Sequence, residues 1–320
     1  MKLYFSFLLI CLAFLGYRSG YTQNSETFRI VGYYSLDAAM SDVDKKTLKR
    51  LTHVNLWFLN PDSTGNFTRD LSGLTSFVAA AHDNNVKVLF SIGGGSKQAQ
   101  YKRLLQDEHR PQLIKNLVNE VIKYNIDGID VDLEGSDIDD YYEPFVLELS
   151  AALKQHSKLI TAAIAIYYKD QFTDKALNEY DFVNVMSYDR TGPWRPEKPG
   201  PHSTYEHAVE DLDYFGIERK IPREKMTLGV PFYGYGFDGT GSEAISMNYQ
   251  KIVTTFKGAE DHDQLTMPDG KILYYNGIPT MKKKTLLASE KASGIMIWQV
   301  LGDTKGKKSL LRTISRTAGK

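Results

Sequence analysis

A short segment of the chain carries four acidic side chains, Asp127, Asp130, Asp132 and Glu134. In an extended strand, residues two apart share a face, so the last three carboxylates would point to one side and the apolar residues between them to the other. Three carboxylates in a partly buried site repel one another, which raises the pKa of at least one of them. A carboxylic acid that keeps its proton near neutral pH can protonate a leaving oxygen, such as that of a glycosidic bond. We expect Glu134, the last of the series and the longest side chain, to be this acid.

A calcium site and an exposed acidic strand are the two alternative interpretations of this segment. Calcium loops take their ligands from turns with interleaved glycine and asparagine, whereas acidic and apolar residues alternate here. An exposed strand would not need so apolar an opposite face. The pattern therefore favours a strand that holds its carboxylates in an enclosed site.

The rest of the chain contains the elements that could enclose such a strand. Eight apolar, β-rich runs recur at Phe28–Tyr34, Thr52–Leu59, Val86–Ile92, Ile126–Glu134, Leu159–Ile166, Asp181–Tyr188, Met226–Gly234 and Gly294–Val300. Stretches with helical spacing of apolar residues lie between them. This alternation predicts an α/β fold, a (β/α)8 TIM barrel with a parallel sheet covered by helices. The acidic run would be the fourth strand, with its carboxylates climbing the interior towards the C-terminal mouth, where the active sites of such barrels lie.

An open, doubly wound sheet is the alternative architecture. No GxGxxG motif follows the first run, as a dinucleotide-binding sheet would require, and polar residues gather at the ends of many different strands, which favours the barrel. The stretch 237–275 is longer than the other connections and predicts a small lobe inserted after the seventh strand, with a short helix around Tyr249–Phe256. Since no linker divides the remainder, we expect one catalytic domain over residues 21–320.

The first twenty residues are typical of a secretory signal. Lys2 precedes an apolar run from Leu3 to Leu15, and the small residues Ser19 and Gly20 follow. A buried helix is the alternative, but the run is too short to span a bilayer and no second run of about 18 apolar residues follows. Cys11 is the only cysteine, and its apolar neighbours do not suit a lipoprotein signal. We expect a secreted or periplasmic protein without disulfides.

The charge balance and the histidine spacing exclude several kinds of partner. Lysine plus arginine equals aspartate plus glutamate at 39 each, so no net positive field is present to bind nucleic acid. The seven histidines form no spacing such as HExxH, so we expect no metal and no other cofactor. We expect a monomer with a neutral partner and no membrane span.

The acidic segment, DGIDVDLEG from Asp127, resembles the DxxDxDxE signature of family 18 glycoside hydrolases, the chitinases and endo-β-N-acetylglucosaminidases. The resemblance extends in the family's order through GYY at Gly32, SIGGG at Ser91, MSYD at Met186, GVPFYG at Gly229 and GIMIWQ at Gly294. It covers nearly the whole chain after the expected signal, and the spacing of its acidic residues is highly specific.

This resemblance implies a reaction in which the substrate supplies its own nucleophile. The acetamido carbonyl of the sugar in subsite −1 would attack the anomeric carbon, while Glu134 protonates the leaving oxygen and later activates water. Asp132 would orient the acetamide N–H, and Asp130 would help to hold the shared proton. Tyr188 would hydrogen-bond the acetamide oxygen, which positions it for attack.

The same resemblance implies a set of substrate-binding residues. Trp298 would form the floor of subsite −1 and Trp194 an aromatic platform of subsite +1, while Ser91 and Tyr33 would lie close to the lower aspartates. Asp189 would be a polar ligand in subsite −1, and Met186 would shape its wall. The expected substrate-binding residues are Tyr33, Phe58, Ser91, Met186, Asp189, Trp194, Tyr233 and Trp298.

The chain also departs from the family pattern. Leu133 and Gly135-Ser136 replace the tryptophan and the Tyr-Pro pair of many chitinases, and Tyr235 replaces the arginine of GVPFYGR. The catalytic spacing is unaffected. Because the inserted lobe is also short, we expect neither a deep tunnel nor strong processivity on crystalline polymer.

Three functions remain open on the sequence alone. We expect hydrolysis of chitin, chito-oligosaccharides or other N-acetylglucosamine-containing glycans, and the platform offered by Trp194 favours chitin. An endo-β-N-acetylglucosaminidase acting on the chitobiose core of N-glycans would share the mechanism. An inactive carbohydrate-binding protein is the third alternative, but such proteins usually lack the terminal glutamate or its aspartate partner, and both are present here.

Overall fold

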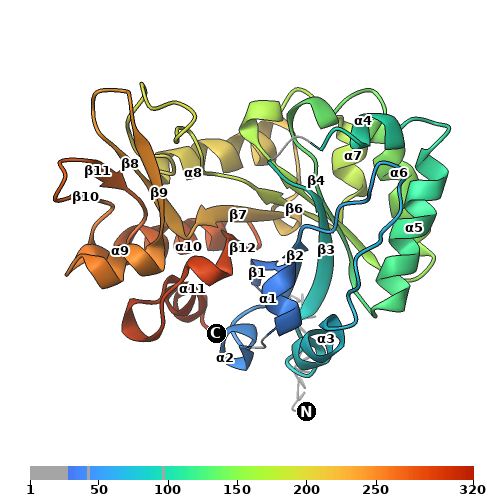
Figure 1. Ribbon diagram of the computed structural model, residues 1–320, viewed down its shortest axis with the longest axis horizontal. Helices are drawn as coiled ribbons and strands as arrows, with labels where there is room; N and C mark the ends of the chain where they lie inside the picture. The colour runs from blue at the N-terminus through green and yellow to red at the C-terminus, as the bar shows by residue number, and fades with distance from the viewer. Residues whose placement is uncertain (1–27, 42–43, 96–97) are drawn as a thin grey trace, which may run out of the picture.

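Eight parallel strands form a closed barrel in the computed structural model, which describes residues 28–41, 44–95 and 98–320 (Figure 1). Their order around the barrel is β1-β12-β7-β6-β5-β4-β3-β2. The strands are β1 (Arg29–Ser35), β2 (His53–Trp57), β3 (Lys87–Gly93), β4 (Gly128–Asp132), β5 (Leu159–Ile164), β6 (Phe182–Val185), β7 (Met226–Pro231) and β12 (Gly294–Trp298). Each lies within or overlaps one of the eight apolar runs of the sequence, so the predicted TIM barrel is confirmed.

The two faces of the barrel strands differ in polarity. Outward-facing residues such as Ile129 and Val131 belong to the large apolar core between the sheet and the helices. The interior instead carries fully buried polar side chains: Asn55, Ser91, Asp130, Thr161, Asn184 and Thr227. Because side chains alternate along a strand, one polar residue between two apolar ones is enough to build this inner layer.

Helices cover the outside of the barrel. They are α1 (Leu36–Ser41), α2 (Lys45–Leu48), α3 (Leu74–His82), α4 (Tyr101–Leu104), α5 (Arg110–Lys123), α6 (Tyr142–Lys154), α7 (Asp174–Glu179), α8 (Tyr205–Asp213), α10 (Ile278–Lys291) and α11 (Leu310–Thr317). Their starts follow from local sequence: Thr204 begins α8 with a capping box that includes His207, and Pro111 stands in the first turn of α5. No helix in the described ranges is both long and apolar enough to cross a bilayer.

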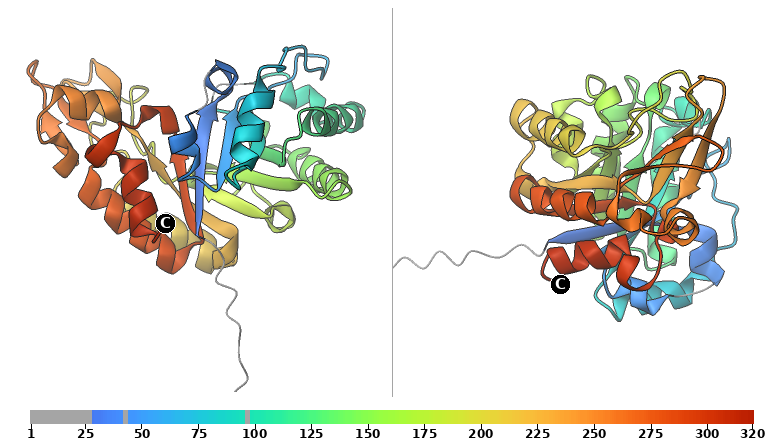
Figure 2. Two further views of the ribbon diagram at one scale, coloured as in Figure 1. Left: turned by 90° about the horizontal axis from the view of Figure 1, so that it is seen from below. Right: turned by 90° about the vertical axis from the view of Figure 1, so that its left-hand side faces the viewer.

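A second sheet is inserted between β7 and α10. It is antiparallel, in the order β10-β11-β8-β9, and consists of β8 (Tyr233–Phe237), β9 (Ala244–Asn248), β10 (Gln264–Thr266) and β11 (Ile272–Tyr274), with α9 (Tyr249–Thr255) beside it. Figures 1 and 2 show this orange lobe on the side of the barrel away from α5 and α6. The insertion after the seventh strand and its short helix are thus present.

The chain enters the lobe earlier than the sequence predicted. The seventh apolar run continues to Gly234, but β7 ends at Pro231 and β8 begins at Tyr233. At the break, the Phe232 amide donates to the carbonyl of Trp298 in β12, and the next residues pair with β9 and β11 instead. Tyr233 and Tyr235 therefore belong to the lobe, although they follow the barrel strand directly.

Asp127 lies at the N-terminal end of the acidic strand, away from the mouth. Its carboxylate accepts hydrogen bonds from the Val88 amide and from Nε2 of His82, each at 2.8 Å. Asp127 thus ties β4 to β3 and α3, which is a structural role. The expected signal segment, including Cys11, lies outside the described residues.

Candidate active site

Asp130 is the most completely hydrogen-bonded carboxylate of the acidic strand. Oδ2 accepts from the hydroxyls of Tyr33 at 2.6 Å and Ser91 at 2.8 Å, and Oδ1 accepts from Thr161 at 2.6 Å and Asn184 at 3.2 Å. Burial raises the pKa of Asp130, and these four hydrogen bonds oppose the rise because they favour the charged form. Asp130 is therefore a fixed acceptor below the mouth of the barrel.

Asp132 lies two residues further along β4, nearer the mouth of the barrel, and its carboxylate lacks such partners. It is buried, and its Oδ1 has no hydrogen-bond partner among the described residues. Burial, followed by the charges of Glu134 and Asp130, raises its pKa well above the ordinary value. An unpartnered buried carboxyl costs free energy unless it holds a proton or meets a polar ligand. Asp132, which lies between the other two acids, can thus hold a proton or accept a hydrogen bond from a bound molecule.

Glu134 follows the strand and remains extended, with φ −130° and ψ 151°, before a short 3-10 helix, η1 (Gly135–Asp137). Burial raises the pKa of its carboxyl to about 7, and the negative charges of Asp189 and Asp137 contribute further. A substantial fraction therefore holds a proton near neutral pH. This is the state that a general acid requires.

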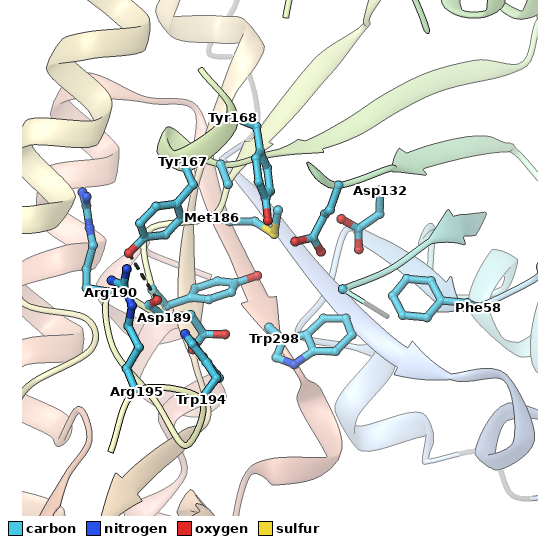
Figure 3. A pocket seen from close by; sticks show the side chains of 14 residues that line it. Phe58, Asp132, Tyr167, Tyr168, Met186, Asp189, Arg190, Trp194, Arg195 and Trp298 are labelled. Carbon is cyan, nitrogen blue, oxygen red and sulfur yellow. Dashed lines mark hydrogen bonds between the residues drawn. The ribbon is translucent and has the colours of Figure 1, made fainter. Parts of the chain in front are cut away.

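These carboxyls open into a cavity of about 550 Å³. Its lining residues are Phe58, Gly95, Asp132, Glu134, Ala165, Tyr167, Tyr168, Met186, Tyr188, Asp189, Arg190, Trp194, Arg195 and Trp298. Figure 3 shows Trp298 between Phe58 on one side and the cluster of Tyr167, Arg190, Trp194 and Arg195 on the other. The volume suits a ligand of a few sugar rings, because ligand pockets commonly measure about 300 to 1,000 Å³.

An aromatic wall forms one side of the cavity. Trp298, at the end of β12, stacks on Phe58 with ring centroids 5.8 Å apart and planes 23° apart. Tyr33 and Trp57 contact the same indole at 5.2 and 5.6 Å. This packing leaves Trp298 lining the cavity in a fixed orientation, as a surface for the apolar face of a pyranose requires. Trp194, with 57% of its surface exposed, offers a second aromatic face across the cavity.

Tyr188 is a buried hydroxyl donor at the cavity. Burial and the charge of Asp132 raise its pKa well above the ordinary value, so the hydroxyl keeps its proton. Within the described part of the chain, its hydroxyl contacts one side-chain acceptor, Sδ of Met296, which is a weak acceptor at 3.8 Å. The donor is therefore available to a stronger acceptor on a ligand.

Asp189 is held from behind by the inserted lobe. Its Oδ1 accepts from the hydroxyls of Tyr233 at 2.5 Å and Tyr235 at 3.1 Å, and Nδ1 of His202 lies 3.2 Å away. Both tyrosines stand on β8, where residues two apart share a face. The expected ligand Tyr233 is thus placed against Asp189 rather than in the cavity lining.

The chain is similar to known proteins over most of its length. The model of the glycosyl hydrolases family 18 matches residues 29–303. The chain belongs to this family. Among solved family 18 structures, ChiB of the chitin utilization locus of Flavobacterium johnsoniae is 35% identical with a TM-score of 0.81, over 92% of this chain and 94% of that one. A chitinase from Bacteroides thetaiotaomicron is 26% identical with a TM-score of 0.74, over 90% and 96%.

Curated relatives carry both enzyme and non-enzyme names. A chitinase-like effector of Moniliophthora roreri is 31% identical over 67% of this chain, and a chitinase-like mite allergen of Dermatophagoides farinae is 28% identical over 64%. The chain spans only 59% of the effector and 44% of the allergen. Family membership therefore fixes the fold and leaves the activity of this chain to be argued from its own residues.

The family 18 site residues expected from the sequence divide into two layers. Eight of them line the cavity, namely Phe58, Asp132, Glu134, Met186, Tyr188, Asp189, Trp194 and Trp298. The other four lie behind it: the hydroxyls of Tyr33 and Ser91 donate to Asp130, and that of Tyr233 donates to Asp189. The structure thus brings all twelve into one connected site.

Several residues of this site were not predicted from the sequence. Thr161 and Asn184 bond Asp130, and both carry a usable signal, since each is a polar residue inside an apolar strand with inward period-two spacing. Arg190 and Arg195 line the cavity from a loop, and Tyr167 and Tyr168 line it from the short 3-10 helix η2 (Ile166–Tyr168). Neither segment is long enough for a periodicity that would show which way a side chain points. No group of three or more metal-ligating side chains occurs in the described ranges.

Proposed function

We propose that this chain is a retaining glycoside hydrolase that cleaves β-1,4 linkages between N-acetylglucosamine residues of chitin or chito-oligosaccharides. The observation that carries the proposal is the position of Glu134, a carboxyl with a pKa of about 7 in a cavity that also contains Asp132, Tyr188 and Trp298. The chitinase names of similar solved structures support the substrate class.

The proposed reaction needs no nucleophile from the protein. The acetamido oxygen of the sugar in subsite −1 attacks its own anomeric carbon as the bond to the leaving oxygen breaks, and Glu134 gives that oxygen its proton. A positively charged oxazolinium ring results. Glu134, now a carboxylate, takes a proton from the water that opens this ring, so both the acid and the configuration at the anomeric carbon are restored.

The neighbouring side chains fit roles in this reaction. Asp132 has a free acceptor oxygen for the acetamide N–H and, when ionised, a negative charge to stabilise the oxazolinium ring. Tyr188 has a hydroxyl available to the acetamide oxygen. Both interactions would fix the acetamide in the orientation needed for attack, which lowers the activation barrier of the reaction.

We also propose that the protein is exported through its first twenty residues and that residues 21–320 form the catalytic domain. The apolar run from Leu3 to Leu15 supports export. Mass determination of the N-terminus after expression with the full sequence checks this, and a mature protein that still begins at Met1 would contradict it.

Glu134→Gln tests the proposed activity. The amide keeps the size of the side chain but cannot donate the proton, so we expect hydrolysis of chitotetraose to fall by at least about a hundredfold. Mass spectrometry of products from chitotetraose and from a high-mannose glycopeptide, run side by side, measures it. Cleavage of the glycopeptide alone would replace chitin by the N-glycan core as substrate, and an unchanged rate for the variant would remove Glu134 from the acid role.

A further inference from the structure

His202 lies beside the cavity without lining it. Its side chain is 1% exposed and packs against the rings of Tyr233 and Tyr235, with centroid distances of 5.0 and 4.7 Å. Nothing in the reaction proposed above uses it. A polar ring so deeply buried needs a reason, because burial of an imidazole without hydrogen bonds is costly.

The hydrogen bonding of His202 identifies its tautomer. Nδ1 lies 3.2 Å from Oδ1 of Asp189, and a carboxylate can only accept, so Nδ1 carries the hydrogen. Nε2 has no partner in the described part of the chain. A neutral ring leaves a lone pair there, whereas a protonated ring would leave a buried N–H unpaired, so the neutral Nδ1–H form fits the site.

The backbone around His202 is fixed independently of this ring. The His202 carbonyl accepts from the Arg190 amide at 3.1 Å, and the Ser203 hydroxyl donates to the Ser187 carbonyl at 2.7 Å. Lys284, itself fully buried, donates to the carbonyl and hydroxyl oxygens of Ser203 at 2.9 and 2.7 Å. The loop therefore presents the imidazole to Asp189 as a rigid support.

Asp189 needs such support because its own backbone is unusual. It has φ 61°, a left-handed conformation that is uncommon for residues other than glycine. Its side chain meets three donors on a single oxygen, namely Tyr233, Tyr235 and His202. Tyr235, one of these donors, stands where the family pattern has an arginine.

We propose that His202 is a positioning residue that holds the carboxylate of Asp189 through its Nδ1–H, and so fixes the distance of that negative charge from Glu134. This inference rests on the function proposed above. It assigns to a buried histidine the task of positioning a carboxylate that lines the same cavity as Glu134.

The electrostatics of the cavity make the distance matter. After burial, the charge of Asp189 is the largest contribution to the raised pKa of Glu134. The titratable or charged groups that face this pair are Asp132, Asp137, Tyr167, Tyr168, Tyr188, Arg190, Arg195, Tyr233 and Tyr235, with Lys284 behind Ser203. None of these groups is itself substituted in a His202 variant. If Asp189 moves away from Glu134, its charge raises the pKa of Glu134 less, so Glu134 loses its proton at lower pH.

Two substitutions separate positioning from mere packing. His202→Leu keeps a similar volume and removes the donor, whereas His202→Asn places an amide N–H where Nδ1 stood. We expect H202L to lower kcat/KM on chitotetraose by about tenfold, as loss of a hydrogen bond to a charged group would. In the pH profile of kcat/KM, the fall on the alkaline side should move to lower pH in H202L. H202N should recover most of the rate and the original position of this fall.

The outcomes separate the two proposals. Two results would overturn the role of His202. One is an H202L variant with the wild-type kcat/KM and the wild-type alkaline fall; the other is an equal loss of kcat/KM in both variants with no shift of that fall. ¹⁵N NMR of histidine-labelled wild-type protein tests the geometry without any substitution in the protein measured, with H202N used only for assignment. We expect an Nδ1–H tautomer, and an Nε2–H tautomer would exclude the bond to Asp189. A wild-type protein that cleaves no glycan would defeat the proposed function but leave this NMR result standing.

Discussion

Burial and neighbouring charge, acting on single side chains, determine which acid of the strand keeps a proton. Asp130 receives four donors, Asp132 receives none to its Oδ1, and Glu134 lies at the cavity. Three residues of similar chemistry are thus differentiated by their surroundings. The same separation of environments is how paired carboxylates in other enzymes come to act as acid and as stabiliser.

The pKa of Glu134 predicts the pH dependence of the reaction. Because the leaving oxygen needs a proton from this group, kcat/KM should reach its maximum at a pH well below 7 and should fall as the pH rises through about 7. A pH series on chitotetraose between about pH 5 and 9 measures the limb. A rate that stays constant up to pH 9 would show that the acid is not Glu134 in this environment.

At the scale of the elements, the close contact of β3 and β4 places Asp132. Gly93, the last residue of β3, pairs with Asp132, and a Cβ at this position would lie 2.3 Å from the Asp132 carbonyl oxygen. Its φ is 98°, which other residues adopt only with strain. Glycine is therefore required both by the backbone conformation and by the neighbouring strand.

Gly93→Ala should destabilise the fold and displace Asp132. Gly270 is a matched control, since its φ is also positive at 87° but a Cβ there would meet nothing within 4 Å. We expect G270A to cost about 1 kcal/mol of unfolding free energy for backbone strain, and G93A to cost at least about 2 kcal/mol more. Urea unfolding of both variants measures the difference. Equal stabilities would mean that the strands can separate at no cost.

The elements also show what the sequence could predict. All eight barrel strands were predictable because each is an apolar run, and the acidic face of β4 followed from its alternation. The lobe was less predictable: β9 to β11 are short and partly exposed, and the run into β8 continues β7 without a polar break. Asp189 is bonded by His202 from the same loop and by Tyr233 and Tyr235 from the lobe, and no local pattern encodes such contacts.

For the molecule as a whole, the barrel and its lobe position different residues of the site. The barrel interior orders the acids, and two tyrosines of β8 in the lobe hydrogen-bond Asp189 from the far side. The site is thus assembled from segments as far apart as Tyr33 and Trp298. Correct closure of the barrel is therefore a condition for activity.

Dependence on the substrate's acetamide tests the central claim most directly. The measurement is hydrolysis of chitotetraose and of its fully de-N-acetylated counterpart by the same wild-type preparation, with products weighed by mass spectrometry. We predict cleavage of the first and no detectable cleavage of the second, because only the first carries an internal nucleophile. Comparable cleavage of both would contradict the account.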